Sequence, residues 1–202
     1  MAQGRALSVR GPHKGATSTE AQAKSEMPGS RIVHLATHGG TNVVGDNGLG
    51  LYNVALAFTG ANETLNGPLR PAADDQDQED GLLYGFEASR LPLFGTELVT
   101  LSACETGHGD HAPGSEGLYS LAYAFRLAGA ENVLMSLWTV SDSQTAAFME
   151  LFYETWFDRR SDHPSETAGE SLRRALRDTQ LMAKARKDFS ERHWAAFVLV
   201  EN

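Results

Sequence analysis

Short apolar runs alternate with amphipathic segments along this chain. The apolar runs predict strands at 32–36, 98–103, 132–138 and 195–200, with a weaker candidate at 51–58. The segments between them predict helices at 17–27, 82–90, 118–128, 141–156 and 167–179. Because the strands are apolar at both alternating positions, we expect an α/β fold with a mostly parallel sheet and helices on both faces.

Capping boxes mark the starts of several helices, where a Ser or Thr side chain precedes Glu or Gln by one turn. They are Thr17 with Glu20, Ser141 with Gln144 and Thr167 with Glu170. Residues 60–81 read instead as a flexible loop, since glycines and prolines precede the acidic run DDQDQED at 74–80. The simplest interpretation of that run is a solvated loop, and a regulatory or cleavable loop is the alternative.

The composition narrows the classes of function. A length of 202 residues fits one compact domain. The net charge of −9 argues against a broad nucleic-acid surface, because phosphate contacts need Lys and Arg. We find neither an apolar run long enough for a transmembrane helix nor the apolar stretch of a secretory signal near the start. The single cysteine excludes an internal disulfide and suits the reducing cytoplasm, which we expect as the location.

Two residues with reactive side chains follow the carboxyl ends of predicted strands, which is where sites form in parallel sheets. They are His38 and Cys104, and they meet at one edge if their strands are neighbours. A thiol attacks a carbonyl as thiolate, and a nearby imidazole is its usual activator. The N–H groups of Gly39 and Cys104 are natural donors to a developing oxyanion. The alternative for a lone cysteine is an inert buried thiol.

Several segments together resemble the CHAT domain family, a branch of the caspase-like cysteine peptidases that is often attached to tetratricopeptide repeats. The segments are RIVHLATHGG at 31–40, DGLLYGFEASRLPLFGTELVTLSACETGHGD at 80–110, GSEGLYSLAYAFRLAGAENVLMSLWTVSD at 114–142 and HWAAFVLVEN at 193–202. The stretch around Leu56 to Gly67 is similar to the one that the family carries between its two catalytic strands. The pair ATHG and SACETG, in that order on consecutive core strands, is the most specific part of the resemblance.

The resemblance implies a three-layer caspase-like fold in which residues 1–202 form one CHAT domain. It implies that Cys104 is the nucleophile, that His38 is its base or imidazolium partner, and that Gly39 contributes to the oxyanion hole. The implied activity is cysteine endopeptidase cleavage of protein substrates through an acyl-enzyme, without metal or organic cofactor. A tetratricopeptide-repeat regulatory domain in the parent protein is a further expected partner, whereas nucleic acid and membrane are not expected.

One departure from the family pattern concerns the amino end. The family has one or more strands, including a central one, before the segment that corresponds to 17–27. Only residues 6–9 could serve as such a strand here. A missing central strand would leave unpaired backbone edges, so we expect a domain truncated at its N-terminus.

Substrate binding is predicted for two acidic residues near the nucleophile. Asp142 and Glu105 could hold a basic side chain of a substrate. For Asp142 the simpler interpretation is that the acid favours a helix N-terminus. His34 shares its strand and its parity with His38, and we interpret it as a packed core histidine.

Three alternatives to a peptidase are open from the sequence. A zinc site that combines Cys104 with His108 and His111 is disfavoured, because only one thiol is present. A catalytically silent scaffold or signalling module would keep the fold without turnover. A hydrolase of small acyl esters would use the same thiol.

Overall fold

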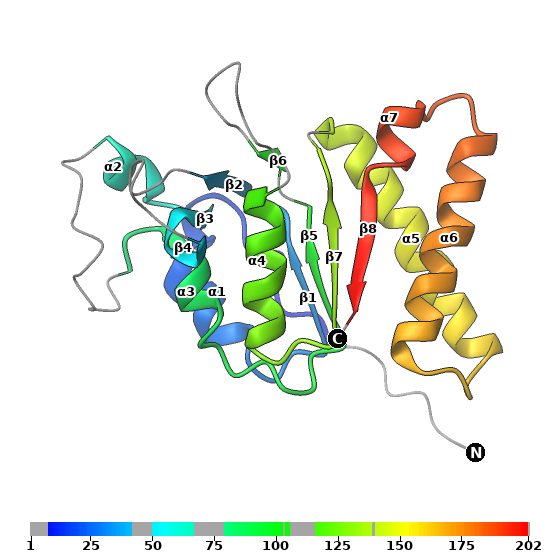
Figure 1. Cartoon of the computed structure of the whole chain (residues 1–202), viewed down its shortest axis with the longest axis horizontal. Helices are drawn as coiled ribbons and strands as arrows, with labels where there is room; N and C mark the ends of the chain where they lie inside the picture. The colour runs from blue at the N-terminus through cyan, green and yellow to red at the C-terminus, as the bar shows by residue number, and fades with distance from the viewer. Residues whose placement is uncertain are drawn as a thin grey trace.

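The computed structural model describes residues 8–41, 50–66, 79–102, 104–105, 116–138 and 140–201. Its strands form two four-stranded sheets, called sheet A and sheet B below. Figure 1 shows the strands of sheet A near the centre of the molecule, with sheet B to their left. In the ranges described, no helix combines the length and the apolar character that crossing a membrane requires.

Sheet A has the strand order β1-β5-β7-β8. It comprises β1 (Ile32–Leu35), β5 (Leu98–Leu101), β7 (Asn132–Ser136) and β8 (Phe197–Glu201). The first three strands run parallel, and β8 forms an edge antiparallel to β7. Every residue of β5 and β7 is buried, which is why both read as near-continuous apolar runs in the sequence. The predicted α/β fold with a mostly parallel sheet is confirmed.

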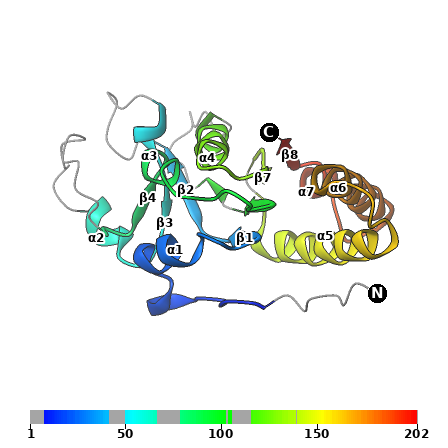
Figure 2. The ribbon, with the colours of Figure 1, turned by 90° about the horizontal axis from the view of Figure 1, so that it is seen from below.

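Helices cover both faces of sheet A, as a three-layer fold requires. On one face lies α4 (Glu116–Leu127), where Phe125 shares a core cluster with Val133. On the other lie α5 (Asp142–Asp162) and α6 (Ala168–Ala185), where Phe152 and Trp156 share a second cluster with Leu134. Figure 2 shows α4 on one side of the sheet and α5 on the other. The short α7 (Glu191–Trp194) leads into β8.

The capping boxes of the two long C-terminal helices have different outcomes. At the start of α6, the Thr167 hydroxyl accepts a hydrogen bond from the Glu170 N–H at 3.2 Å, and the Glu170 carboxylate accepts one from the Thr167 N–H at 3.1 Å. That box is confirmed. At the start of α5, Ser141 is the N-cap residue, but its side chain makes no capping hydrogen bond. The helix begins where we predicted, without the predicted contact.

Sheet B was not predicted from the sequence. Its order is β4-β3-β2-β6, with β4 (Leu82–Tyr84), β3 (Val54–Ala57), β2 (His38–Thr41) and β6 (Cys104–Glu105). The pairs β4–β3 and β3–β2 are antiparallel, and β2–β6 is parallel. The candidate residues His38 and Cys104 therefore belong to this smaller sheet. Gly39 and Gly40, residues whose type favours a turn, both lie inside β2.

Two further element predictions need correction. The predicted helix at 82–90 is divided between β4 and the short α3 (Gly85–Ala88). The predicted loop at 60–81 contains α2 (Ala61–Leu65), and its residues 67–78 lie outside the described ranges. The weak strand candidate at 51–58 contains β3, preceded by a 3-10 helix, η2 (Gly50–Asn53).

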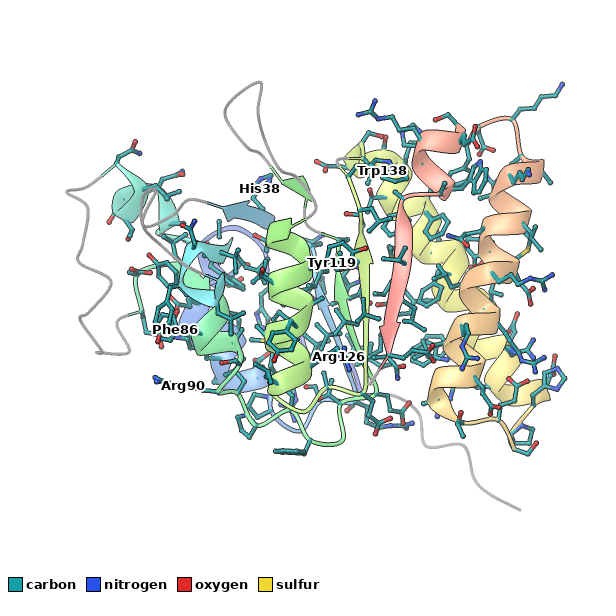
Figure 3. All side chains as sticks on the ribbon, viewed as in Figure 1. His38, Phe86, Arg90, Tyr119, Arg126 and Trp138 are labelled. Atoms are coloured by element: carbon teal, nitrogen blue, oxygen red, sulfur yellow. The ribbon has the colours of Figure 1, made fainter. Side chains whose placement is uncertain are left out.

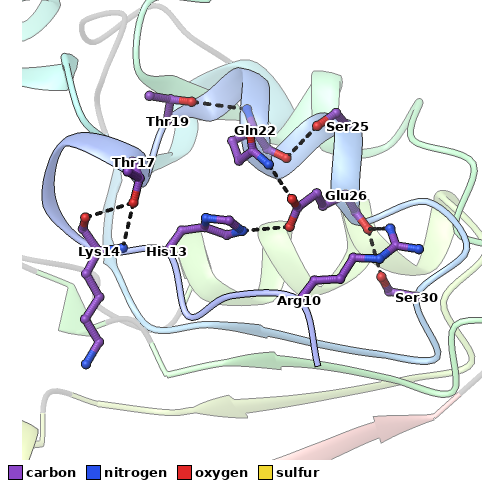
Figure 4. A network of polar contacts seen from close by, with 9 residues as sticks. All are labelled: Arg10, His13, Lys14, Thr17, Thr19, Gln22, Ser25, Glu26 and Ser30. Carbon is purple, nitrogen blue, oxygen red and sulfur yellow. Dashed lines mark hydrogen bonds and ion pairs between the residues drawn. The ribbon is translucent and has the colours of Figure 1, made fainter. Parts of the chain in front are cut away.

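Arg10 and His13, which precede α1 (Glu20–Glu26), make polar contacts with Glu26 of that helix (Figure 4). His13 Nε2 lies 2.7 Å from Glu26 Oε2, and this contact lowers the pKa of Glu26. The N-cap of α1 is Thr19, whose side chain accepts from Gln22 N, so the predicted capping box from Thr17 is wrong. Between residues 8 and 31 the structure has a 3-10 helix, η1 (Gly15–Thr17), and α1 but no strand. The expected truncation stays a prediction.

A buried charge cluster joins α1 to the segment that forms β4 and α3. Lys24 Nζ lies 2.6 Å from Glu20 Oε1 and 2.7 Å from Glu87 Oε1, and the three side chains are 15%, 1% and 6% exposed. Glu20 also accepts a hydrogen bond from Gly81 N, and Glu87 accepts one from Tyr84 N, both at 2.9 Å. Burial raises the pKa of Glu20 to about 7 and also raises that of Glu87, despite the opposing effect of Lys24.

Candidate active site

The segment that contains β1 and β2 pairs twice with the segment that contains β5 and β6, once in each sheet. In sheet A, β1 pairs with β5 as far as Leu35 opposite Leu101. In sheet B, β2 pairs with β6 from His38 opposite Cys104 onward. Both segments therefore leave sheet A and enter sheet B at the same level. We call this passage, which includes residues 36–37 and Ser102, the crossing.

The crossing brings His38 and Cys104 together at the level of the backbone. They are register partners in neighbouring parallel strands, and such strands lie about 5 Å apart. The condition set by the sequence, that the histidine and cysteine segments are neighbours, is met in both sheets, since β1 pairs with β5 and β2 pairs with β6. The His38 side chain is exposed at the edge of the molecule, as Figure 3 shows.

Gly39 and Glu105 form the next register pair of β2 and β6. Gly39 is buried and also pairs with Leu56 of β3, so it lies inside sheet B with a strand on either side. The oxyanion role of Gly39 and the substrate role of Glu105 stay predictions.

A chain of hydrogen bonds lies directly beneath the crossing. His34 Nε2 lies 2.9 Å from Ser102 Oγ, and His34 Nδ1 lies 3.3 Å from the hydroxyl of Tyr153. The Tyr153 hydroxyl lies 2.8 Å from Thr100 Oγ1. This chain joins β1, the end of β5 and α5. His34 and His38 were expected on one strand, but they lie on β1 and β2, separated by the crossing.

Desolvation shifts the pKa values of two members of this hydrogen-bonded chain, although His34 keeps an exposed surface. The surrounding groups lower the pKa of His34 by desolvation. Desolvation also raises the pKa of Tyr153 to about 12. Both effects favour the uncharged forms. At neutral pH the hydrogen-bonded side chains are therefore a neutral imidazole and hydroxyl groups.

Trp138 and Asp142 follow β7, which borders β5 on the side away from β1. The indole Nε1 of Trp138 donates a hydrogen bond of 2.7 Å to the Arg192 carbonyl. Figure 3 places Trp138 at the same edge of the molecule as His38. Asp142 is the exposed first residue of α5, where its charge favours the helix N-terminus. Its role in substrate binding stays a prediction.

Metal ligation was considered for the histidines near Cys104. Within the part of the chain that the structure describes, no group of three or more His, Cys, Asp and Glu residues could hold a metal ion. His108 and His111 lie outside that part.

A comparison with protein families now identifies the chain. The family model described as "CHAT domain" matches residues 6–202. The chain belongs to the CHAT domain family. This family is caspase-like, in agreement with the α/β fold of sheet A and its helices.

Among curated proteins, this CHAT domain is similar to tetratricopeptide repeat protein 28 of Mus musculus. The two are 27% identical over 203 residues, which cover 94% of this chain and 8% of the relative. The chain thus spans a small fraction of the length of the protein that it matches. The similarity agrees with the association between CHAT domains and tetratricopeptide repeats.

Sequence reasoning missed several residues around the crossing. Ser102 lies inside the SACETG motif, and that was the signal that could have drawn attention to it. Tyr153 gave no such signal, because its place on α5 reads as one more apolar position of an amphipathic helix. His34 was interpreted as a packed core histidine, whereas the structure gives it an exposed surface and polar contacts with Ser102 and Tyr153.

Proposed function

We propose that this CHAT domain is a cysteine endopeptidase that cleaves protein substrates with Cys104 as nucleophile and His38 as its partner. The observation that carries the proposal is the register of β2 and β6, in which His38 pairs with Cys104 at the start of both strands. Membership of a caspase-like family supports the same assignment. Because both residues are fixed in backbone-paired strands, their separation is set by the sheet and not by a loop.

The proposed reaction has two halves. The Cys104 thiolate attacks the peptide carbonyl carbon, and the carbonyl oxygen becomes an oxyanion that backbone N–H groups at Gly39 and Cys104 stabilise. The tetrahedral intermediate then expels the amine, which takes a proton from the His38 imidazolium and leaves a thioester. Water attacks that thioester and gives its proton to His38, and the acid product leaves as the thiolate is restored. No cofactor enters this sequence.

The substrate would be an exposed loop of another protein that reaches the edge where His38 lies. Asp142 at the start of α5 and Glu105 beside Cys104 are the acids proposed to hold a basic side chain next to the cleaved bond. The chain carries a net charge of −9, which also favours substrates with basic segments.

The direct test is cleavage of a proteome-derived peptide library by the chain and by Cys104→Ala and His38→Ala variants. We expect cleavage to vanish in Cys104→Ala. For His38→Ala we expect a loss of about 10²- to 10⁴-fold, the usual contribution of general acid–base catalysis. Cleavage that persists in pure Cys104→Ala protein would rule out the mechanism.

An electrophilic peptide that traps thiolates separates this proposal from a silent scaffold. A peptidase both labels at Cys104 and cleaves peptides, whereas a silent module does neither. Labelling together with hydrolysis of a small acyl ester, but without peptide cleavage, would favour the hydrolase alternative.

We further propose that the activity is controlled by a tetratricopeptide-repeat module in a longer protein. The support is the similarity to a relative whose name contains such repeats and of which this chain matches only 8%. If the proposal holds, cleavage by a protein that carries both parts should depend on a ligand of the repeats, while the isolated CHAT domain should be insensitive to it.

A further inference from the structure

Side-chain hydrogen bonds, in addition to backbone pairing, stabilise the crossing. Ser102, the first residue after β5, donates its N–H to the Leu35 carbonyl at 3.2 Å. Its hydroxyl lies 2.9 Å from His34 Nε2. On the other segment, Thr37 Oγ1 donates to the Ala57 carbonyl of β3. Each of the two segments is thus fastened by a side chain at the point where it changes sheet.

The His34 ring connects this fastening to α5, on the far side of sheet A from α4. Its second nitrogen, Nδ1, lies 3.3 Å from the Tyr153 hydroxyl, and the two ring centroids are 5.7 Å apart. Tyr153 in turn contacts Thr100, the register partner of His34 in β5. The imidazole therefore spans β1, β5 and α5 at once.

From these contacts we propose that His34, Ser102 and Tyr153 form a brace that positions Cys104 relative to His38. Ser102 and Cys104 lie on either side of Ala103, so a shift of Ser102 is passed to Cys104 through few rotatable bonds. His34 likewise precedes His38 by only a short stretch. The inference rests on the proposed function, since it names what sets the geometry of that dyad. The three are positioning residues, because none is placed against a reacting atom.

The protonation state of His34 limits which groups of the brace donate hydrogen bonds and which accept them. A neutral imidazole has one N–H donor and one acceptor nitrogen. The hydroxyls of Ser102 and Tyr153 must therefore take opposite roles toward His34, one donating and the other accepting. The hydrogen bonds between α5 and the crossing then all share one direction, which the tautomer of His34 sets. Replacement of any one member leaves its neighbour with an unused donor or acceptor at a partly buried position.

The test uses the fact that Cys104 is the only cysteine of the chain. The rate of alkylation by iodoacetamide, followed by intact mass from pH 5 to 9, reports the reactivity and the apparent pKa of this one thiol. For Tyr153→Phe and Ser102→Ala we expect the alkylation rate near pH 6.5 to fall by about two- to tenfold, the equivalent of one hydrogen bond. His34→Phe should lose at least as much, and His34→Gln, which keeps a donor and an acceptor, should recover part of the loss.

A matched control separates positioning from loss of stability. Thr155→Val on the same helix removes a hydroxyl that donates to the Leu151 carbonyl and does not touch the crossing. It should lower the midpoint of thermal unfolding by an amount similar to Tyr153→Phe while leaving the alkylation profile unchanged. Profiles identical to wild type in Tyr153→Phe, Ser102→Ala and His34→Phe would overturn the brace.

The same assay keeps this inference distinct from the proposed function. If His38→Ala changes the thiol profile and the brace variants do not, the dyad stands and the brace fails. If His38→Ala leaves the thiol profile unchanged, the dyad fails, and the brace that positions this dyad fails with it.

Discussion

The buried cluster around Lys24 allows a quantitative test of the fold. Lys24→Met removes the one ammonium group that lies within 3 Å of both Glu20 and Glu87. Methionine fills a similar volume, so the substitution leaves no large cavity. Its effect is to leave the two buried carboxylates without their cation. Loss of one partner of a buried ion pair costs about 3–5 kcal/mol of unfolding free energy.

The pH dependence gives the prediction its second part. The pKa of Glu20 is about 7 in the folded chain, above the ordinary 4.5 of the unfolded one. The stability that this group contributes is therefore complete below pH 4.5 and is lost as the pH rises through 7. Without Lys24, both acids can take up a proton at pH 5. The penalty of Lys24→Met should therefore be large at pH 8 and small at pH 5.

Urea unfolding followed by circular dichroism at both pH values measures this penalty. With a urea dependence of about 2 kcal/mol per M, the midpoint at pH 8 should fall by about 1–3 M. The double variant Glu20→Gln, Lys24→Met should regain most of the loss, because it leaves one buried carboxylate in place of two. Lys187→Met, at an exposed position, is the control. A loss below 1 kcal/mol at pH 8, or an equal loss at both pH values, would refute the reasoning.

Two further predictions concern local backbone structure. Gly81→Ala should destabilise the chain by at least about 1 kcal/mol, because Gly81 has φ +85° and an added Cβ would lie 2.4 Å from Ala61 N. Gly29→Ala, at φ +75° with open space around it, should cost less, and equal midpoints of chemical unfolding for both variants would contradict the steric argument. Thr167→Ala should cost about 1 kcal/mol through loss of the α6 cap, measured in the same way, whereas Thr167→Ser should be nearly neutral.

The main sheet could be predicted because its strands are buried on both faces. Leu98–Leu101 and Asn132–Ser136 are wholly buried, so their composition alone marks them as central strands. The cap of α6 was predictable for a similar reason, since Thr167 and Glu170 interact locally. Signals of this kind depend on neighbours in sequence or on burial, and both leave a trace in the residue pattern.

Two strands of sheet B, β2 and β6, left no such trace. β2 has the sequence HGGT, whose glycines favour a turn, and β6 is only the dipeptide Cys104–Glu105. Neither segment would form a strand by its own propensity. Each is held in strand geometry by pairing with a partner that is remote in sequence, β2 between β3 and β6.

The sequence by itself determined the α/β class, the order of the main elements, and the choice of His38 and Cys104 as candidates, because each of these depends on local pattern or on a motif. Only the tertiary structure decided that both segments change sheet at the same level and that His34 is linked to Tyr153 on α5. The physical reason is that a crossing and its hydrogen bonds are made between distant parts of the chain, and no local preference encodes which partner will lie opposite.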